Sequence, residues 1–263
     1  MLELFSKGRA FAFFFLMLVL VVVYFMLRRA EKGKVPEIRR VAALDAIDEA
    51  VGRATELGKA VLVHMGYTDA GVRGEHAGAI LAGMSIMAHV AEMCARLGTK
   101  ITVAPAYPEL LPYVHETVKS AYQRGGKLEE YKEDSVVFLG NQQWPWATGI
   151  MGTLEREKPG AHIGVGPYHG ESLIVAESGA RVGAITILGT HRKSQIPFFV
   201  AACDYALIGE ECYAAGAYLS KDPAQIGSIA GQDWLKIITI ALMVLGTIVT
   251  SLGSGVLSDL LKM

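Results

Sequence analysis

The sequence has few cysteines and almost no net charge. Its 3 cysteines are scattered and form no CxxC pair, which excludes a disulfide framework and is typical of a reducing compartment. The formal net charge of −1 provides no overall field that would attract nucleic acid, so no nucleic-acid partner is expected. Any electrostatic role must come from local charge.

The motifs of several common enzyme classes are also missing. No GxxxxGK[ST] occurs, and Ser172 does not lie in a GxSxG nucleophile elbow. Residues 164–170 begin like a dinucleotide fingerprint, but they give GxGxxxG late in the chain and no acidic partner follows about 20 residues on. No two histidines have HxxxH or HExxH spacing. We therefore assign no catalytic residue, metal ligand or cofactor, and the sequence favours a protein that is not an enzyme.

Two long uncharged runs are present, at residues 10–27 and 237–257. The first has about 18 residues and reaches ~27 Å as a helix, close to the roughly 30 Å of a bilayer's hydrocarbon core. A cleaved signal peptide is the alternative, but Arg28 and Arg29 follow directly, where a cleavage site would stand. A buried core helix is the alternative for the second run, yet Trp234 precedes it as aromatic residues at a membrane interface do. Both runs are predicted to be transmembrane helices.

The basic residues around the first run predict its orientation. Lys7 and Arg9 precede it, whereas a larger group follows within about 15 residues. That group is Arg28, Arg29, Lys32, Lys34, Arg39 and Arg40. The positive-inside rule then places the following domain in the cytoplasm and both chain termini outside. The sequence thus predicts a two-pass protein of the cell membrane, with the lipid bilayer as a partner.

These runs divide the chain into parts. The predicted parts are a tail (1–9), a membrane helix (10–27), a basic linker (28–42), an α/β domain (43–220), a connector (221–236), a second membrane helix (237–257) and a tail (258–263). In the connector, Asp222 and Pro223 are typical of a helix cap and its first turn. Gly227 and Gly231 are expected to loosen that helix and Asp233 to begin the next, so the connector is predicted to be jointed.

Between the two runs, short β-rich segments alternate with helical ones. Apolar runs predict strands at residues 60–66, 101–105, 135–140, 161–166, 182–189 and 198–209. Helices are predicted at residues 43–57, 77–97 and 110–124. Uninterrupted apolar strands separated by helices require a parallel sheet covered on both faces. The predicted fold is a Rossmann-like, doubly wound α/β domain with a mostly parallel sheet.

Two helices carry surfaces suited to close packing. The helix at residues 77–97 is apolar nearly all round, so either it lies deep in the domain or a second subunit covers its outer face. In the second membrane run, Thr247, Ser251 and Gly255 form a stripe of small residues at four-residue spacing. Together these surfaces favour a homo-oligomer.

The polar residues of interest lie in the loops expected beyond the carboxyl ends of the strands. In an open α/β sheet these loops form the ligand site. The loops are residues 64–76, 104–109, 140–146, 164–172 and 189–193. The candidate ligand-binding residues are His64, Asp69, Arg73, His76, Asn141, His169, His191 and Arg192. Among them, the arginines would be the contacts for an anion.

The stretches at residues 44–63 and 209–236, with the two end helices, resemble an uncharacterised family of prokaryotic membrane-anchored α/β proteins, a domain of unknown function. The resemblance implies the topology and the extent of the domain and brings no catalytic residues. The leading hypothesis is a homo-oligomeric, membrane-anchored scaffold or binding module whose protein partner the sequence does not identify. The alternative is an enzyme or sensor that binds a nucleotide-like or small anionic ligand at the carboxyl edge of the sheet.

Overall fold

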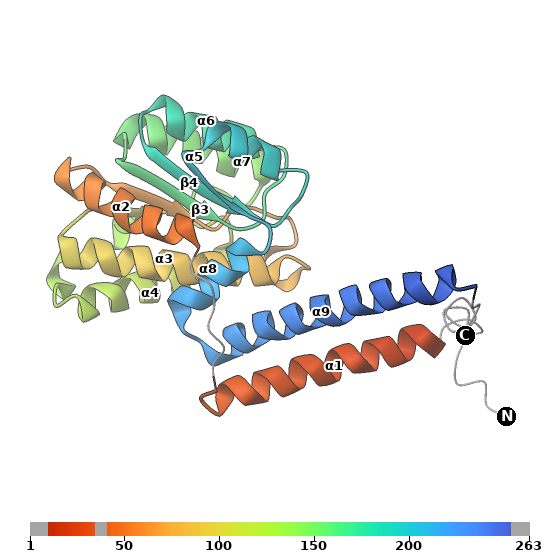
Figure 1. Cartoon of the computed structure of the whole chain (residues 1–263). Coiled ribbons are helices and arrows are strands. Elements are labelled where there is room, and N and C mark those ends of the chain that lie inside the picture. Colours follow the sequence, from red (N-terminus) through yellow and green to blue (C-terminus); the bar gives the residue numbers. More distant parts are fainter. Residues whose placement is uncertain (1–9, 35–40, 254–263) are drawn as a thin grey trace. The chain divides into compact units, whose positions relative to one another are not determined.

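The computed structural model describes residues 10–34 and 41–253, and the chain divides into two compact units. One unit is Arg39–Ser220, and the other combines Met1–Ile38 with Lys221–Met263. Figure 1 shows both units: the α/β unit, and the two long helices α1 and α9 of the other unit. Each unit is described by itself below.

The α/β unit is built on a sheet in which all five described strands are parallel. The strands are β1 (Val61–His64), β2 (Ile101–Val103), β3 (Ala161–Val165), β4 (Ile185–Thr190) and β5 (Tyr205–Ile208). Their order in the sheet is β2-β1-β3-β4-β5. The four strands from β1 to β4 are almost wholly buried, as a parallel sheet covered on both faces requires. The α/β class and the parallel sheet predicted from the sequence are confirmed.

Helices cover both faces of this sheet (Figure 1). On one face lie α2 (Ala42–Glu56), α3 (Ala77–Leu97), α4 (Leu111–Arg124) and α8 (Glu211–Ser220). On the other face lie α5 (Gln143–Glu157), α6 (Ser172–Arg181) and α7 (Ile196–Ala202). Short 3₁₀ helices occur at Gly71–Arg73, Pro108–Leu110, Leu128–Glu130 and Glu133–Ser135. Because each crossover helix returns the chain to the amino end of the next strand, the loops that follow the strands gather at the carboxyl edge.

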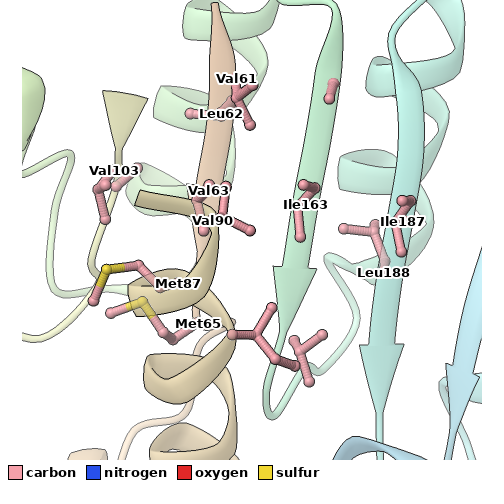
Figure 2. Packing of buried hydrophobic residues seen from close by; sticks show 14 of the residues in the cluster. Val61, Leu62, Val63, Met65, Met87, Val90, Val103, Ile163, Ile187 and Leu188 are labelled. Carbon is pink, nitrogen blue, oxygen red and sulfur yellow. The ribbon is translucent and has the colours of Figure 1, made fainter. Parts of the chain in front are cut away.

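The core on the α3 side begins with a row of branched side chains across the sheet. Val63 pairs in register with Val103 on β2 and with Ile163 on β3, and Ile163 pairs in turn with Ile187 on β4. Figure 2 shows these residues together with Met87 and Val90 of α3, which are fully buried. Branched residues at neighbouring positions on adjacent strands form a continuous apolar surface. Because α3 packs on this surface, few of its positions are polar.

Helix α3 is packed inside the α/β unit. It contacts α2, α4, α8 and the strands β1 to β3. A Cβ atom at Gly83 would lie only 2.0 Å from the carbonyl oxygen of Val165, and one at Gly216 of α8 only 2.7 Å from Cα of Ala82. The small residues therefore allow α3 to pack tightly between the sheet and α8, and the first of the two readings of this helix, burial within the domain, is the observed one.

Two predicted strands differ from the structure. At residues 135–140 the chain makes a single parallel bridge, Val103 with Val136, and the amide of Val137 donates to the carbonyl of Val103 over 2.8 Å. A further step of this ladder would need an N–H at residue 105, and Pro105 has none. The run at 198–209 divides into α7 and β5, because Pro197 occupies the first turn of a helix that ends at Ala202.

The second unit contains α1 (Ala10–Glu31) and α9 (Pro223–Ser251), which lie side by side and antiparallel (Figure 1). Helix α9 begins at the predicted cap, where Asp222 Oδ1 accepts from the amide of Ala224 over 2.9 Å. The expected joint is absent, since α9 runs through Gly227 and Gly231 without a break. Added Cβ atoms would lie 3.0 Å from Leu27 Cα at Gly227 and 3.3 Å from Val23 Cα at Gly231. These glycines let the two helices approach closely instead of loosening α9.

Three described helices are long and apolar enough to cross a membrane: α1, α3 and α9. They differ in burial within the chain, because 56% of the apolar window of α3 is buried, against 0% for α1 and 6% for α9. Length and composition alone therefore do not identify α1 and α9 as the only candidate membrane helices among the described residues. The difference is that α1 and α9 are exposed within the chain and α3 is largely buried. Gly255 of the predicted small-residue stripe lies outside the described residues.

Candidate functional site

The strand order creates a topological switch point between β1 and β3. These strands are neighbours in the sheet, yet β1 leads into α3 on one face and β3 leads into α6 on the other. Where two adjacent strands send the chain to opposite faces, the loops separate beyond their carboxyl ends, and open α/β sheets bind ligands there. The loops after β1 and β3 are therefore the first place to look for a site.

Glycines bring the bases of these two loops into backbone contact. Gly66 has φ +68°, and a Cβ there would lie 2.2 Å from the carbonyl oxygen of Pro167. A Cβ at Gly166 would lie 1.9 Å from the carbonyl oxygen of Met65, and the amide of Tyr67 donates to Pro167 over 2.7 Å. Gly166, part of the incomplete dinucleotide fingerprint, thus serves loop packing.

Beneath these loops, on the α5–α6 side of the sheet, is a chain of buried polar side chains. The Tyr168 hydroxyl lies 3.1 Å from Nδ1 of His64, and Nε2 of His64 lies 2.8 Å from Nε2 of His162. All three side chains are at most 1% exposed. Burial lowers the pKa of His162 to about 3, and burial followed by the neighbouring His162 lowers the pKa of His64 well below its ordinary value. Both imidazoles are therefore neutral at pH 7.

The hydrogen bonds assign the tautomers of this pair. If the Tyr168 hydroxyl donates to Nδ1 of His64, then Nε2 of His64 carries a hydrogen and donates it to His162. The remaining hydrogen of His162 is then on Nδ1, which has no partner among the described residues. The opposite assignment would leave the Tyr168 hydrogen unbonded as well, so the first satisfies more groups.

A second polar cluster lies at the carboxyl edge of the sheet, beyond the buried Tyr168–His64–His162 hydrogen bonds. Nη1 of Arg192, after β4, lies 2.9 Å from Nδ1 and 2.8 Å from Nε2 of His169, after β3. Nε2 of His191 lies 2.9 Å from Nδ1 of His76, which precedes α3. Asp69 accepts from the Tyr67 hydroxyl over 2.7 Å. Residues from three loops thus converge on one edge.

Glu171 anchors the loop that carries His169. Its side chain is fully buried, with Oε1 accepting from the amide of His169 over 3.0 Å and Oε2 accepting from Nε2 of Gln143 over 2.6 Å. The next residue, Ser172, donates to Oε1 of Gln195 over 2.7 Å. The loops after β3 and β4 and the start of α5 are therefore held together by hydrogen bonds.

The electrostatics of the edge cluster leave Arg192 as its fixed cation. Burial and then Arg192 lower the pKa of His169, while Glu171 and Asp69 act in the opposite direction. Burial, then His76 and then Arg192 lower the pKa of His191 to about 4. Both imidazoles are therefore neutral near pH 7, and they offer hydrogen-bond donors and acceptors beside a guanidinium that stays charged.

Not all candidate residues join this cluster. Asp69, His76, His169, His191 and Arg192 come together, whereas His64 is buried in the sheet and separated from solvent. Asn141 is exposed, and its backbone carbonyl, not its side chain, accepts from the Tyr67 hydroxyl over 3.3 Å. Arg73 is exposed and makes no hydrogen bond or ion pair within residues 10–34 and 41–253. Tyr67, His162 and Tyr168 were missed, although a histidine inside the apolar run 161–166 was a usable signal.

Within the described part of the chain, no three His, Cys, Asp or Glu side chains gather in a way that could hold a metal ion. A separate hollow of about 510 Å³ lies at the amino end of β2, and its lining includes Lys100, Glu130 and Lys132. It is at the opposite edge of the sheet and shares no residue with the cluster.

Fold and site together define a doubly wound α/β domain with a polar cluster at its carboxyl edge, in a chain that also carries two long apolar helices. The family described as Domain of unknown function (DUF6754) matches residues 1–261, and the chain belongs to this family. The predicted resemblance to a family of unknown function is thereby confirmed. No curated protein and no solved structure matches the chain.

Proposed function

We propose that this protein is a two-pass membrane protein whose cytoplasmic α/β domain binds a small anionic ligand at the carboxyl edge of the sheet. The observation that carries the ligand part is the position of Arg192, a permanent cation held among neutral imidazoles beside the β1–β3 switch point. A guanidinium with adjacent hydrogen-bond donors is suited to phosphate and carboxylate groups. A nucleotide-like molecule would fit this chemistry, because the Asp69 carboxylate, whose Oδ1 accepts from Tyr67, has a second oxygen that can accept from a hydroxyl group of the ligand.

The membrane part is supported by the surfaces of α1 and α9. Their large apolar side chains are exposed within the chain, with Phe14, Val21 and Phe25 of α1 59–65% exposed and Met243 of α9 65% exposed. Contiguous apolar surface on this scale would associate with lipid or another protein. The basic residues from Arg28 onward favour a cytoplasmic location for the domain, with both termini outside.

Membrane insertion and orientation are tested on sealed vesicles that contain the full chain. We expect the protein to resist carbonate extraction, and the domain to be digested by a protease added on the cytoplasmic side alone. Release by carbonate would contradict insertion. Digestion from the opposite side alone would contradict the orientation while leaving insertion intact.

Ligand binding is tested by thermal unfolding of the full chain in mild detergent, with inorganic phosphate and nucleoside phosphates as probes. A probe present at 100 times its Kd stabilises by about 2.7 kcal/mol, which for a domain of this size raises Tm by roughly 5–10 °C. We expect Arg192→Ala to abolish the shift. Lys193→Ala is the matched control, because it removes the adjacent exposed cation and should keep the shift. Equal shifts in both variants would contradict the proposed site.

A homo-oligomeric scaffold is the second candidate, and one surface of the α/β unit favours it. Strand β5 is at the edge of the described sheet, and its Tyr205 and Ile208 are each 43% exposed. Helix α7, which contacts β5, has Val200 58% exposed. Exposed edges with apolar side chains commonly pair with another chain. Native mass spectrometry of the full chain compared with Ile208→Asp tests this, and an unchanged subunit number would argue against the β5 edge as the contact.

A further inference from the structure

The loops beyond the carboxyl ends of β1 to β4 carry more acidic than basic residues. The basic residues there are Arg73, Arg192 and Lys193, and the acidic residues are Asp69, Glu75, Glu109 and Glu171. Arg73 and Lys193 are exposed, so water and salt screen their charges, whereas Glu171 is fully buried and its charge is screened less. A ligand with two or more negative charges would therefore be repelled from much of this edge unless a cation accompanies it.

Asp69 is connected to Arg192 through the loop that carries His169. The amide of Tyr67 donates to Pro167 over 2.7 Å, and the Tyr67 hydroxyl donates to Oδ1 of Asp69 over 2.7 Å. Two residues after Pro167, Nε2 of His169 lies 2.8 Å from Nη1 of Arg192. Burial and then Arg192 lower the pKa of His169, whereas Asp69 raises it. Charges of opposite sign thus act on one imidazole, and an anion bound to Arg192 would also meet the Asp69 carboxylate.

The Asp69 carboxylate has the chemistry and the access to hold a cation. It is exposed and has no ion-pair partner among the described side chains. A carboxylate has about four lone-pair positions, so the bond from Tyr67 leaves room for a cation and for a ligand hydroxyl. Mg²⁺ commonly binds through one or two carboxylates and the phosphate oxygens of a ligand, and it keeps several waters. Such a shared site does not require a group of three protein ligands.

A buried hydroxyl near Asp69 also requires a polar partner. Tyr107, after β2, is 3% exposed, and its hydroxyl has no hydrogen-bond partner within the described residues. Burial raises the pKa of Tyr107, the Thr68 amide acts in the opposite direction, and Tyr67 and Glu171 raise it further. The hydroxyl therefore lies close to the residues that precede Asp69. Buried hydroxyls normally have a partner, and a water bound to Mg²⁺ can donate to one.

We infer that the anionic ligand binds together with a divalent cation of the Mg²⁺ type, which the Asp69 carboxylate and the phosphate oxygens of the ligand hold between them. The cation offsets the repulsion between Asp69 and the ligand, while Arg192 binds a phosphate oxygen directly. Waters of the cation provide the polar partner for Tyr107. This inference rests on the proposed anion site at Arg192 and specifies its ligand as a phosphate compound that carries a divalent cation.

Calorimetric titration of the full chain in mild detergent tests the inference, with inorganic pyrophosphate and ADP as probes, each with Mg²⁺ or with EDTA. We expect binding to be about tenfold or more tighter with Mg²⁺. Asp69→Asn removes the charge but keeps an oxygen that can accept from Tyr67. This variant should lose the Mg²⁺ enhancement, and it should bind the metal-free probes more tightly than the wild type does. Asp134→Asn is the matched control, because it makes the same charge change in the hollow at the opposite edge of the sheet.

The variants separate a cation held by the protein from an effect of Mg²⁺ on the probe alone. Mg²⁺ also lowers the charge of the free probe, and an enhancement of that origin would persist in Asp69→Asn. A persistent enhancement, or equal affinity with Mg²⁺ and with EDTA, would overturn the inference and leave the anion site standing. Tight binding of Mg²⁺ without a probe would also overturn it, because the cation would then not depend on the ligand. If neither probe binds under either condition, the proposed anion site is refuted as well.

Discussion

Helix α3 is held from two sides at adjacent residues, and this makes Gly83→Ala a sharp test of the packing. The Cβ of the alanine would lie 2.0 Å from the carbonyl oxygen of Val165 in β3. An ordinary contact needs more than 3 Å, so helix and strand would have to separate by over 1 Å. Separation is opposed on the far side, because Gly216 brings α8 into contact with Ala82 of α3.

Two effects of opposite sign contribute to this variant. Replacing a glycine with alanine inside a helix gains up to about 1 kcal/mol from helix propensity. Forcing extra volume into a packed core costs typically 1–3 kcal/mol, and sometimes more. Because the atom that Cβ meets is backbone and cannot rotate away, we expect the upper end of this range. The net effect is then a loss of about 2 kcal/mol in the free energy of unfolding, or roughly 4–8 °C in Tm.

Gly52→Ala provides the matched control within α2. No heavy atom lies within 4 Å of its added Cβ, so only the propensity gain of about 0.5–1 kcal/mol remains. Thermal unfolding of both full-length variants in the same detergent, followed by near-UV circular dichroism, should show shifts of opposite sign. Stabilisation by both substitutions would refute the packing of α3 between the sheet and α8.

Two further predictions concern the helix register and the buried histidines. The double variant Val23→Cys/Gly231→Cys should form an intramolecular disulfide on mild oxidation, because the two positions are in close contact. Val23→Cys/Ile237→Cys, displaced by about 9 Å along α9, should not, and mass spectrometry of the peptides distinguishes them. Burial lowers the pKa of His162 from 6.5 to about 3. As the pH falls, His162 therefore becomes protonated in the unfolded chain before it does in the folded chain. Stability should therefore decrease as the pH falls from about 6.5 toward 3. His162→Gln should flatten this dependence in urea titrations, and an identical pH profile would contradict the assignment.

The sequence predicts the strands of this fold better than the helices of one face. β1, β3 and β4 are runs of buried, mostly apolar residues, and their positions follow directly from that pattern. The start of helix α5 is predicted from the sequence to be a loop, because Trp144, Pro145 and Trp146 occupy its first turn. Proline is tolerated there, since the first-turn N–H groups have no partner within the helix. Its strongest helix formers lie in the last two turns, so local propensity gives little warning of where it begins.

The candidate site was predicted in position but not in detail. That polar loops follow the strands is visible in the sequence, and the parallel topology brings those loops to one edge. Which side chains then meet depends on loop conformation. His76 and His191 are 115 residues apart and lie 2.9 Å from one another, and no local pattern encodes such a pair. His64 belongs to β1 and points into the layer beneath α5, which follows only from the strand register with His162.

The contact of Gly66 with Pro167 and of Gly166 with Met65 has a consequence for how this family could diversify. At the carboxyl ends of β1 and β3 the surface that a bound molecule would rest on is peptide backbone, because neither glycine leaves space for a side chain. Substitution there can wedge the strands apart but cannot introduce a new functional group. If the proposed ligand binds there, changes in ligand preference among relatives are expected in the surrounding rim, at positions such as Asp69, His169 and Arg192, while the backbone surface beneath stays chemically constant.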